Sequence, residues 1–312
     1  MSDTIFVISY AELSISRSCT LACDGCAVFA NYGLKRLVSL EEGGGWLRTW
    51  ARRIKPKTFR LLGGEPLMNK DLFGFIRLVS ELWPEAERGV VTNGTLLDRV
   101  PELPEVLTAT GTRLYISLHS NEAEYIETLR KSIRVLHDWI GRYGGDWLSV
   151  SDNREFHRFY KGLGPDMKPF ADNDVNSSWL NCVARVCVNI YDDRLWKCPQ
   201  VLFIKDMAEK YGLGAVPEWQ PYLNYQGVEA AASDQELHAF FTRGSEAVCG
   251  MCPARPQGYL KDIRNRNFNQ PGVERVENDA SPVDYFRLFG ENGIYIHSLL
   301  PPQPPSPVFL IR

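Results

Sequence analysis

The sequence predicts an α/β protein with a parallel sheet, and three observations lead to this fold class. Short apolar, β-prone runs alternate with longer segments whose apolar residues recur at helical spacing. Polar residues follow the ends of successive runs, as in parallel sheets, where ligands bind at the carboxyl ends of the strands. An apolar content of 44% in 312 residues is enough for the core of one large domain or two smaller ones.

The expected elements alternate in the way that right-handed crossover connections require. We expect strands over Thr4–Tyr10, Leu13–Ser16, Thr58–Leu62, Gly89–Thr92, Arg113–Leu118 and Trp147–Val150. Helices are expected over Glu41–Ile54, Asp71–Leu82 and Glu122–Arg142.

Charge and composition argue against several classes of partner. The net charge is −3 and no Lys/Arg run is present, so the basic footprint of a nucleic-acid binder is missing. No apolar run approaches the roughly 18 residues of a membrane span. The first residues lack the basic and apolar regions of a secretory signal, so we expect a cytoplasmic protein. Eight cysteines in such a chain indicate metal ligands rather than disulfides.

Three of these cysteines form a compact motif just behind the first strand. Cys19, Cys23 and Cys26 are spaced C-x₃-C-x₂-C. Three thiolates could hold three corners of a 4Fe–4S cluster and leave the fourth iron open for a ligand. A structural zinc site or a chance grouping of buried cysteines is the alternative, although zinc sites usually show paired C-x₂-C elements.

At these residues the chain resembles the radical S-adenosylmethionine (SAM) superfamily. The resemblance implies a partial (β/α)₆ barrel over roughly residues 5–170. It also implies that the amino and carboxylate groups of SAM bind the open iron. The reduced cluster then cleaves SAM to methionine and a 5′-deoxyadenosyl radical, which abstracts a substrate hydrogen.

The resemblance extends to further motifs that it assigns to SAM binding. A Gly-Gly-Glu-Pro segment matches the GGEP motif, whose backbone and Glu side chain would hold the amino group of SAM, and Thr-Asn-Gly matches the TNG position. Ordinary turn and capping chemistry is the alternative for each. The family usually has an aromatic residue where Gly25 stands, so we expect Phe29 or Val150 to pack on the adenine. The expected SAM-binding residues are Gly63, Gly64, Glu65, Pro66, Thr92, Asn93, Ser117 and His119.

A second group of five cysteines follows. Cys187 and Cys198 flank a predicted hairpin that turns at Asp192-Asp193, and a mostly helical excursion leads to Cys249 and Cys252. This arrangement, which also includes Cys182, resembles the twitch (shortened SPASM) domain with one auxiliary 4Fe–4S cluster. A zinc ribbon is the alternative.

A cubane cluster uses about four thiolates, so one of the five is surplus. It is either a buried bystander or a hydrogen-atom donor to a carbon radical. The usual twitch scheme makes Cys249 and Cys252 both ligands and leaves Cys182 or Cys187 over. The chain is, however, most similar to radical SAM aminoglycoside epimerases of neomycin-type biosynthesis. In that reading Cys249 is the donor, and the cluster ligands are Cys182, Cys187, Cys198 and Cys252.

The segment between the sheet and the second cysteine group is rich in carboxylates and aromatic residues. They could bind the ammonium groups and sugar rings of a cationic, polyhydroxylated substrate, or they could form a solvated linker. The side chains concerned are Asp152, Glu155, Asp166, Asp172, Asp174, Phe156, Phe159 and Tyr160.

We therefore expect residues 1–175 to form the barrel, 176–275 a smaller C-terminal auxiliary-cluster domain, and 276–312 a tail that includes a Pro-rich stretch. The expected activity is epimerisation of an amino sugar, supported by two 4Fe–4S clusters, SAM and a reductant such as flavodoxin or ferredoxin. A radical SAM dehydrogenase of a secondary alcohol and an enzyme that modifies a ribosomal peptide are alternatives. A non-catalytic iron–sulfur or zinc scaffold belongs to a different class and would not cleave SAM.

Overall fold

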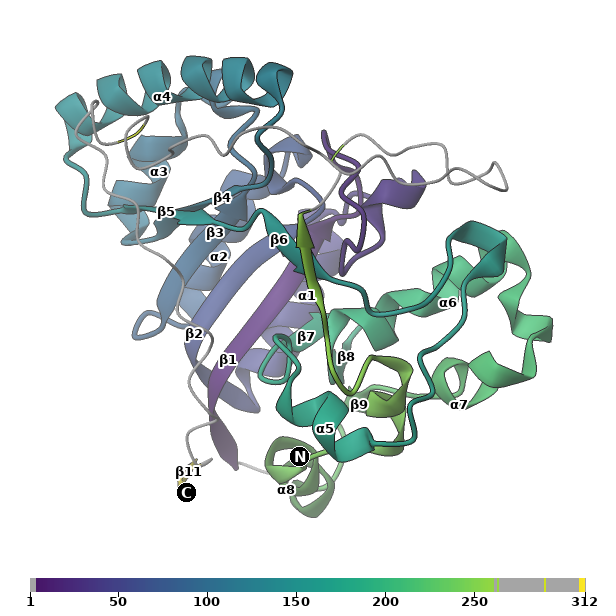
Figure 1. The fold of residues 1–312 in the computed structure, drawn as a ribbon. Helices are drawn as coiled ribbons and strands as arrows, with labels where there is room; N and C mark the ends of the chain where they lie inside the picture. Colours follow the sequence, from purple (N-terminus) through teal and green to yellow (C-terminus); the bar gives the residue numbers. More distant parts are fainter. Residues whose placement is uncertain (1–3, 261–262, 264–288, 290–308, 312) are drawn as a thin grey trace.

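A computed structural model describes residues 4–260, 263, 289 and 309–311. Its centre is a mixed sheet in the order β5-β4-β3-β2-β1-β7-β8-β9 (Figure 1). The first five strands run parallel to one another, so the expected mostly parallel α/β fold is confirmed. These strands are β1 (Ile5–Ser16), β2 (Ile54–Gly63), β3 (Glu87–Thr92), β4 (Arg113–Leu118) and β5 (Leu148–Asp152).

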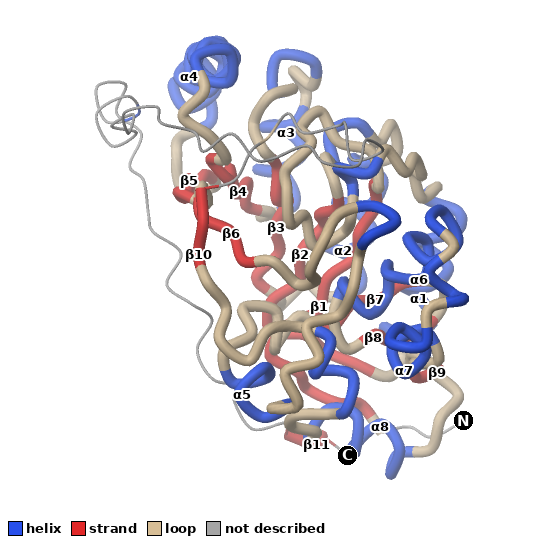
Figure 2. The backbone as a smooth tube through the Cα atoms, turned by 45° about the vertical axis from the view of Figure 1, so that its right-hand side comes forward, coloured by secondary structure: helices blue, strands red, loops and turns tan. Residues whose placement is uncertain are grey.

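Four helices form one layer against the sheet (Figure 2). All connect neighbouring parallel strands, and right-handed crossovers place such helices on the same face. Phe59 of β2 turns toward this layer, where its ring stacks on Trp83 with centroids 4.8 Å apart. The helices are α1 (Leu40–Ala51), α2 (Leu72–Leu82), α3 (Leu103–Thr110) and α4 (Ala123–Tyr143).

Helix α3 was not among the expected elements. It has eight residues, and Pro104 stands in its first turn. A segment this short presents only two turns of apolar periodicity, which is too little to separate a helix from a loop. The other three helices and all the expected strands are confirmed, with β1 continuous where two short strands were expected.

In a (β/α)₆ barrel the sixth parallel strand is expected to pair with the fifth. Here the sixth parallel strand pairs with the first strand instead. Strand β7 (Val188–Tyr191) pairs with β1 rather than with β5. The segment after β5 instead forms β6 (Glu155–His157), which pairs with β10 (Gly258–Leu260) outside the main sheet. The second cysteine group is therefore joined directly to the strand that leads to the first.

The hairpin expected between Cys187 and Cys198 is confirmed. Strands β7 and β8 (Arg194–Trp196) pair antiparallel, with φ of 55° at Asp192 and 56° at Asp193. Positive φ at both central residues is typical of a type I′ turn, which matches the twist of the strands. Strand β9 (Val228–Glu229) then pairs with β8.

The expected helical excursion is also present. It contains α6 (Pro199–Tyr211), α7 (Gln220–Leu223) and α8 (Asp234–Thr242), and α5 (Val175–Leu180) precedes the hairpin. Most of the predicted tail, including its Pro-rich stretch, lies outside the described residues, and β11 (Phe309–Ile311) pairs antiparallel with the start of β1. The three domain boundaries remain predictions. No helix in the described ranges is long and apolar enough to cross a membrane.

The face of the sheet opposite α1–α4 carries polar side chains. Glu12 of β1 lies beside Arg60 of β2 and Asn189 of β7, and register partners share a face. Arg60 stacks over the ring of Tyr115 on β4, 4.2 Å from its centroid, and therefore points away from Phe59. A buried polar face at the centre of a sheet is a place to look for a binding site.

Candidate functional site

The first cysteine motif forms a loop at the carboxyl end of β1. Cys23 is buried, whereas Cys19 and Cys26 are partly exposed, and all three are free thiols. The sulfur of Cys19 accepts hydrogen bonds from the Leu21 backbone N–H (3.4 Å) and from Asn93 Nδ2 (3.5 Å). Donors aimed at a sulfur stabilise its thiolate form, which is the form that binds iron.

The two glycines of the GGEP segment let β2 approach this loop closely. The Gly64 N–H donates to Ser16 O at 2.6 Å, and the Glu65 N–H donates to Ser18 O at 2.8 Å. A Cβ on Gly64 would lie 2.4 Å from Ser18 O, and one on Gly63 would lie 2.1 Å from Ser16 O. The glycines are thus required by contact with the chain that leads into the cysteine loop.

The carboxylate of Glu65 has three hydrogen-bond partners within the chain, and its expected contact with SAM stays a prediction. Glu65 is fully buried and accepts hydrogen bonds from Leu67 N–H (3.0 Å), Thr92 Oγ1 (2.7 Å) and Asn93 N–H (2.9 Å). Burial raises the pKa of the Glu65 carboxyl to about 7, although the three hydrogen-bond donors lower that pKa. The side chain therefore connects the GGEP segment to the TNG segment, while Pro66 begins the short helix at residues 66–68.

The TNG segment in turn holds the cysteine loop. Asn93 Nδ2 donates to Thr20 Oγ1 at 3.0 Å as well as to the sulfur of Cys19. Thr92 Oγ1 accepts from the Gly94 N–H at 3.1 Å, which fixes the turn after β3. The predicted motifs therefore meet at one edge of the sheet as a connected network.

Ser117 and His119 lie at the end of β4, at the same edge. His119 Nδ1 is 4.0 Å from the sulfur of Cys23, so this imidazole borders the cysteine loop. Phe29 and Val150, expected at the adenine, are both buried. Phe29 stacks on Tyr160 at 5.6 Å with φ of 55°, a conformation that bulky side chains rarely adopt.

The donor set of this edge fits a 4Fe–4S cluster better than a single ion. Within the described residues, no three His, Cys, Asp or Glu side chains converge tightly enough to coordinate one metal ion. In a 4Fe–4S cluster each thiolate binds a different iron, so the cysteine sulfurs lie further apart than the ligands of a single metal ion. The three cysteines would hold the cluster, with Asn93 and the Leu21 N–H as donors to the sulfur of Cys19.

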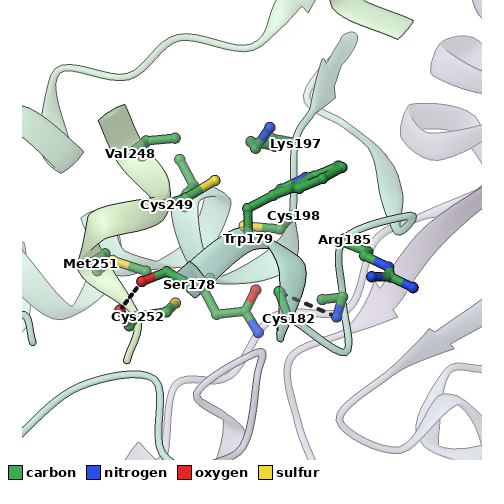
Figure 3. A pocket seen from close by; sticks show the side chains of 13 residues that line it. Ser178, Trp179, Cys182, Arg185, Lys197, Cys198, Val248, Cys249, Met251 and Cys252 are labelled. Carbon is green, nitrogen blue, oxygen red and sulfur yellow. Dashed lines mark hydrogen bonds between the residues drawn. The ribbon is translucent and has the colours of Figure 1, made fainter. Parts of the chain in front are cut away.

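Four cysteines of the second group line one cavity of about 30 Å³ (Figure 3). They come from separate segments: the end of α5, the start of α6, and the short helix of residues 247–251. Trp179, Lys197 and Met251 complete much of the wall. The four are Cys182, Cys198, Cys249 and Cys252.

The assignment of the five cysteines to ligand and donor roles stays a prediction. Cys249 lines the cavity together with three other cysteines. Cys187 does not line the cavity; it directly precedes β7, two residues before Asn189, which is the register partner of Glu12 on β1. The reason is the pairing of β7 with β1, which turns the start of the hairpin toward the central sheet.

Burial raises the pKa of the Cys182 and Cys252 thiols, and that of Cys198 to about 12. Uncompensated, such thiols stay neutral, whereas bound iron would supply the positive charge that stabilises four thiolates together. The cavity wall is largely apolar apart from its four sulfurs, so it is suited to a cluster of low net charge. The four cysteines that line the cavity would hold such a cluster.

A buried cluster around Glu12 was not expected from the sequence. Glu12 is 3% exposed, and Tyr10 Oη donates to its Oε2 at 2.8 Å. Burial raises the pKa of Glu12 to about 7. The only signal in the sequence was a carboxylate within an apolar strand.

The carboxylates between β5 and α5 have structural partners. Arg154 binds Asp152 with Nε 2.8 and 2.9 Å from its two oxygens. Asp174 caps α5 by accepting from the Ser177 N–H, and Asp172 accepts from the Ala254 N–H, both at 3.0 Å. Phe159 and Tyr160 are buried in the core. Substrate contacts by this segment remain a prediction.

Comparison with known proteins bears on the first half of the chain. Residues 13–144 match the family described as "Radical SAM superfamily". The chain contains a radical SAM domain. The match runs from the second half of β1 to the end of α4 and includes the cysteine, GGEP and TNG segments, so the expected resemblance is confirmed there.

This radical SAM domain is similar to part of several GTP 3′,8-cyclases. The one from Stenotrophomonas maltophilia is 32% identical over 122 residues, covering 38% of this chain and 36% of the relative. The one from Campylobacter curvus is 31% identical over 94 residues, covering 29% of each. The chain thus spans only about a third of the length of the curated relatives it matches.

Two solved structures share low similarity with much of the chain. BtrN in complex with AdoMet and 2-DOIA is 15% identical with a TM-score of 0.41, covering 70% of this chain and 83% of BtrN. SuiB of Streptococcus suis, bound to precursor peptide SuiA, is 13% identical with a TM-score of 0.39, covering 78% and 66%.

Replacing Gly64 by Ala tests the close contact between the GGEP segment and the cysteine loop. The new Cβ would meet Ser18 O, so G64A should lower the unfolding free energy by about 1–3 kcal/mol. It should also lower the iron content after anaerobic reconstitution. Gly141→Ala is the matched control, because its Cβ would meet no atom within 4 Å on helix α4. That variant should gain up to about 1 kcal/mol and keep its iron. Equal iron in both variants would contradict the assignment.

The raised pKa of Glu12 predicts how stability depends on pH. A carboxyl whose pKa rises from 4.5 to about 7 on folding favours the folded state only while it is protonated. Its contribution is full below pH 4.5 and is lost as the pH rises through about 7, a change of up to about 3 kcal/mol. Urea denaturation of cluster-free protein between pH 4.5 and 8 should show this fall.

Glu12→Gln should make that fall shallower without abolishing it, because Glu65 titrates in the same direction. Glu81→Gln, at an exposed position on α2, should leave the pH dependence unchanged. An unaltered slope in E12Q would show that Glu12 ionises in the folded protein as it does in the unfolded chain.

Proposed function

We propose that the protein is a radical SAM enzyme that acts on an unactivated C–H bond. The supporting observation is the hydrogen-bonded network that joins the three-cysteine loop to the GGEP and TNG segments through Glu65 and Asn93. When bound, the reduced cluster and SAM supply a 5′-deoxyadenosyl radical. The chain's part is to hold Cys19, Cys23 and Cys26 in one loop at the ligand-binding edge of a parallel sheet.

A second, auxiliary 4Fe–4S cluster would be held by the four cysteines that line the cavity. This differs from our sequence-based assignment, since Cys249 becomes a ligand and Cys187 the remaining thiol. The twitch scheme, with both late cysteines as ligands, agrees with this grouping. The cavity lies close to the sheet because β7 and β8 extend the sheet from β1.

Within this frame we favour epimerisation of a polyhydroxylated amino sugar. Burial raises the pKa of the Cys187 thiol, which favours its S–H form, and a thiol S–H can return a hydrogen atom to a carbon radical. The polar side chains of the sheet face opposite α1–α4 are suited to a hydroxylated, cationic substrate. A flavodoxin or ferredoxin would supply single electrons.

The main alternative is oxidation of a secondary alcohol, in which the second electron leaves through the auxiliary cluster and no thiol is required. The four-cysteine cavity supports this reaction as well as epimerisation. The GTP 3′,8-cyclases that match part of the chain make cyclisation of a nucleotide a further alternative, which rests on that partial similarity alone. Solvent deuterium in the product separates these reactions, since only return of hydrogen from an exchangeable thiol incorporates it.

Iron and sulfide analysis of two variants tests the assignment of the cysteines. Cys187→Ala should keep about eight irons, still form 5′-deoxyadenosine, and lose epimer formation. Cys249→Ala should retain about four irons, because the auxiliary cluster loses one of its four thiolates while the three-cysteine site keeps all of its ligands. Eight irons in C249A and four in C187A would reverse the assignment. Epimerisation by C187A would exclude it as the donor.

A further inference from the structure

An open groove of about 360 Å³ adjoins the cysteine cavity. It is formed by the end of α5, the segment before β7, and the end of α8. Figure 1 shows α5 and α8 at the same end of the molecule. The groove wall contains three aromatic side chains and three cations, and we call it the cationic groove. These six residues are Trp179, Phe240, Phe241, Arg185, Lys197 and Arg243.

The groove is positively charged although the whole chain has a net charge of −3. Within the described residues, no Asp or Glu lines it. Glu246 lies behind the wall, 2.9 Å from Lys197 Nζ and 3.4 Å from Arg243 Nε, and balances one of these two charges. Arg185 has no ion-pair partner in the part of the chain that the structure describes, and its Nη1 donates to the Leu180 carbonyl at 2.9 Å. The groove is therefore suited to a partner with an acidic surface.

Two of the three cations are held in place before any partner binds. The Arg243 guanidinium stacks over Phe240, 3.5 Å from the ring centroid, and donates to Tyr225 Oη at 2.7 Å. Lys197 is 8% exposed, and its Nζ donates to the Gly244 carbonyl at 2.9 Å. Side chains that are already ordered lose little conformational freedom on binding, so their charge costs little to use.

Apolar side chains are exposed beside the groove. Leu180 is 53% exposed and Val183 is 46% exposed, and they are two of the five large exposed hydrophobic residues among those described. Both lie in the sequence between Trp179 and Arg185, which line the groove. Exposed apolar side chains next to fixed charges are typical of surfaces that bind other proteins. A small inorganic anion would make no use of them.

The cationic groove and the cysteine cavity share part of their walls. Trp179, Arg185 and Lys197 line both. In Figure 3 the Arg185 side chain points away from the cavity cysteines. A protein bound in the groove would therefore be separated from the four thiols by these shared side chains.

We propose that the cationic groove is the docking site of an acidic one-electron carrier protein of the flavodoxin or ferredoxin class. The inference rests on the proposed auxiliary cluster, because a redox group in the neighbouring cavity is what such a carrier would serve. Docking forms no covalent bond. One electron crosses, so that the carrier gains the electron that the enzyme loses, or the reverse.

The size and charge of the groove agree with this class of partner. Electron-transfer complexes are among the smallest protein interfaces, so a groove with two exposed apolar side chains beside it is sufficient. Opposite charges on the two surfaces speed their encounter, and this effect falls steeply as salt is added.

The test isolates the auxiliary site within the whole chain. Cys19, Cys23 and Cys26 are replaced by Ala, and the reconstituted protein is reduced, separated from the reductant and mixed anaerobically with oxidised flavodoxin. Each flavin takes one electron from the protein and one proton from solvent, and the absorbance of the neutral semiquinone reports the rate. Arg185→Glu should lower the second-order rate constant about tenfold at low ionic strength, because it replaces attraction by repulsion. At 1 M salt, where the Debye length is about 3 Å, the two rates should converge.

Three controls separate docking from damage to the cysteine cavity. Arg134→Glu makes the same charge change at an exposed position on α4, which connects β4 to β5 at the other edge of the sheet, and should leave the rate unchanged. Arg185→Lys keeps the charge and should react at nearly the parent rate. A basic cytochrome c as electron acceptor should react faster with R185E, because the changed charge attracts it.

A variant without any charge change tests the apolar side of the groove. Leu180→Ser should lower the rate of transfer to flavodoxin several-fold at low and at high salt, since it removes an apolar contact. Tyr143→Ser is the matched control, because Tyr143 is 37% exposed at the end of α4.

The outcomes separate this inference from the proposed function. If the triple Ala variant holds no iron, the cavity binds no cluster, and both the auxiliary cluster and the docking site are overturned. If it holds about four irons and R185E reacts with flavodoxin as the parent does, only the docking site is overturned. Slower transfer from R185E to both flavodoxin and cytochrome c would also overturn it, since Arg185 would then act on the cluster. Should R185E lose its iron, the comparison of L180S with Y143S decides in the same way.

A final comparison assigns the groove to one of the two cysteine groups. In the Cys249→Ala background, which should keep the first cluster alone, R185E should leave transfer to flavodoxin unchanged. An equal slowing in both backgrounds would contradict a docking site dedicated to the cysteine cavity.

Discussion

The buried carboxylate of Glu65 is the constraint on which the site depends. It accepts from Thr92 and Asn93 at the end of β3 and from Leu67 beyond β2, while its own backbone N–H donates to Ser18. Three separate chain segments are therefore fixed around one side chain. Replacing it would leave three buried donors without an acceptor, and each such loss costs roughly 1–3 kcal/mol. The cysteine loop keeps its place because the ends of two strands are tied to its entry.

The second organising feature is the pairing of β7 with β1. Strand β1 has twelve residues, and one of its edges pairs with β2. Strand β7 pairs with the other edge, and the second cysteine group joins the sheet there. This pairing separates the five later cysteines into two environments. Cys187 precedes β7 and does not line the cavity, while Cys249 lines it with three other cysteines. A chain in which β7 followed β5 would bring neither residue to its present neighbours.

Much of the fold could be predicted from the sequence, because alternation of strands and helices and the hairpin turn at Asp192-Asp193 are local signals. The cysteine spacing and the GGEP and TNG segments also identified the residues that meet at the sheet edge. What sequence could not provide was the direction of each side chain. The hydrogen bonds from Thr92 and Asn93 to Glu65, for example, join segments far apart in the sequence. The choice of Cys249 as donor came from the resemblance to aminoglycoside epimerases, and the local sequence around the five later cysteines does not show which of them line one cavity.

Glu12 shows why the two halves of the chain act on one another through a single strand. It lies on β1 four residues before Ser16, a distance of about 13 Å along an extended strand. The cysteine loop begins just beyond Ser16, so the deoxyadenosyl radical would be generated at one end of this span and the Cys187 thiol would lie near the other. No flexible loop intervenes between them. A substrate bound over the polar face of β1 would then lie between the cysteine loop and the strand that the second cysteine group adds to the sheet.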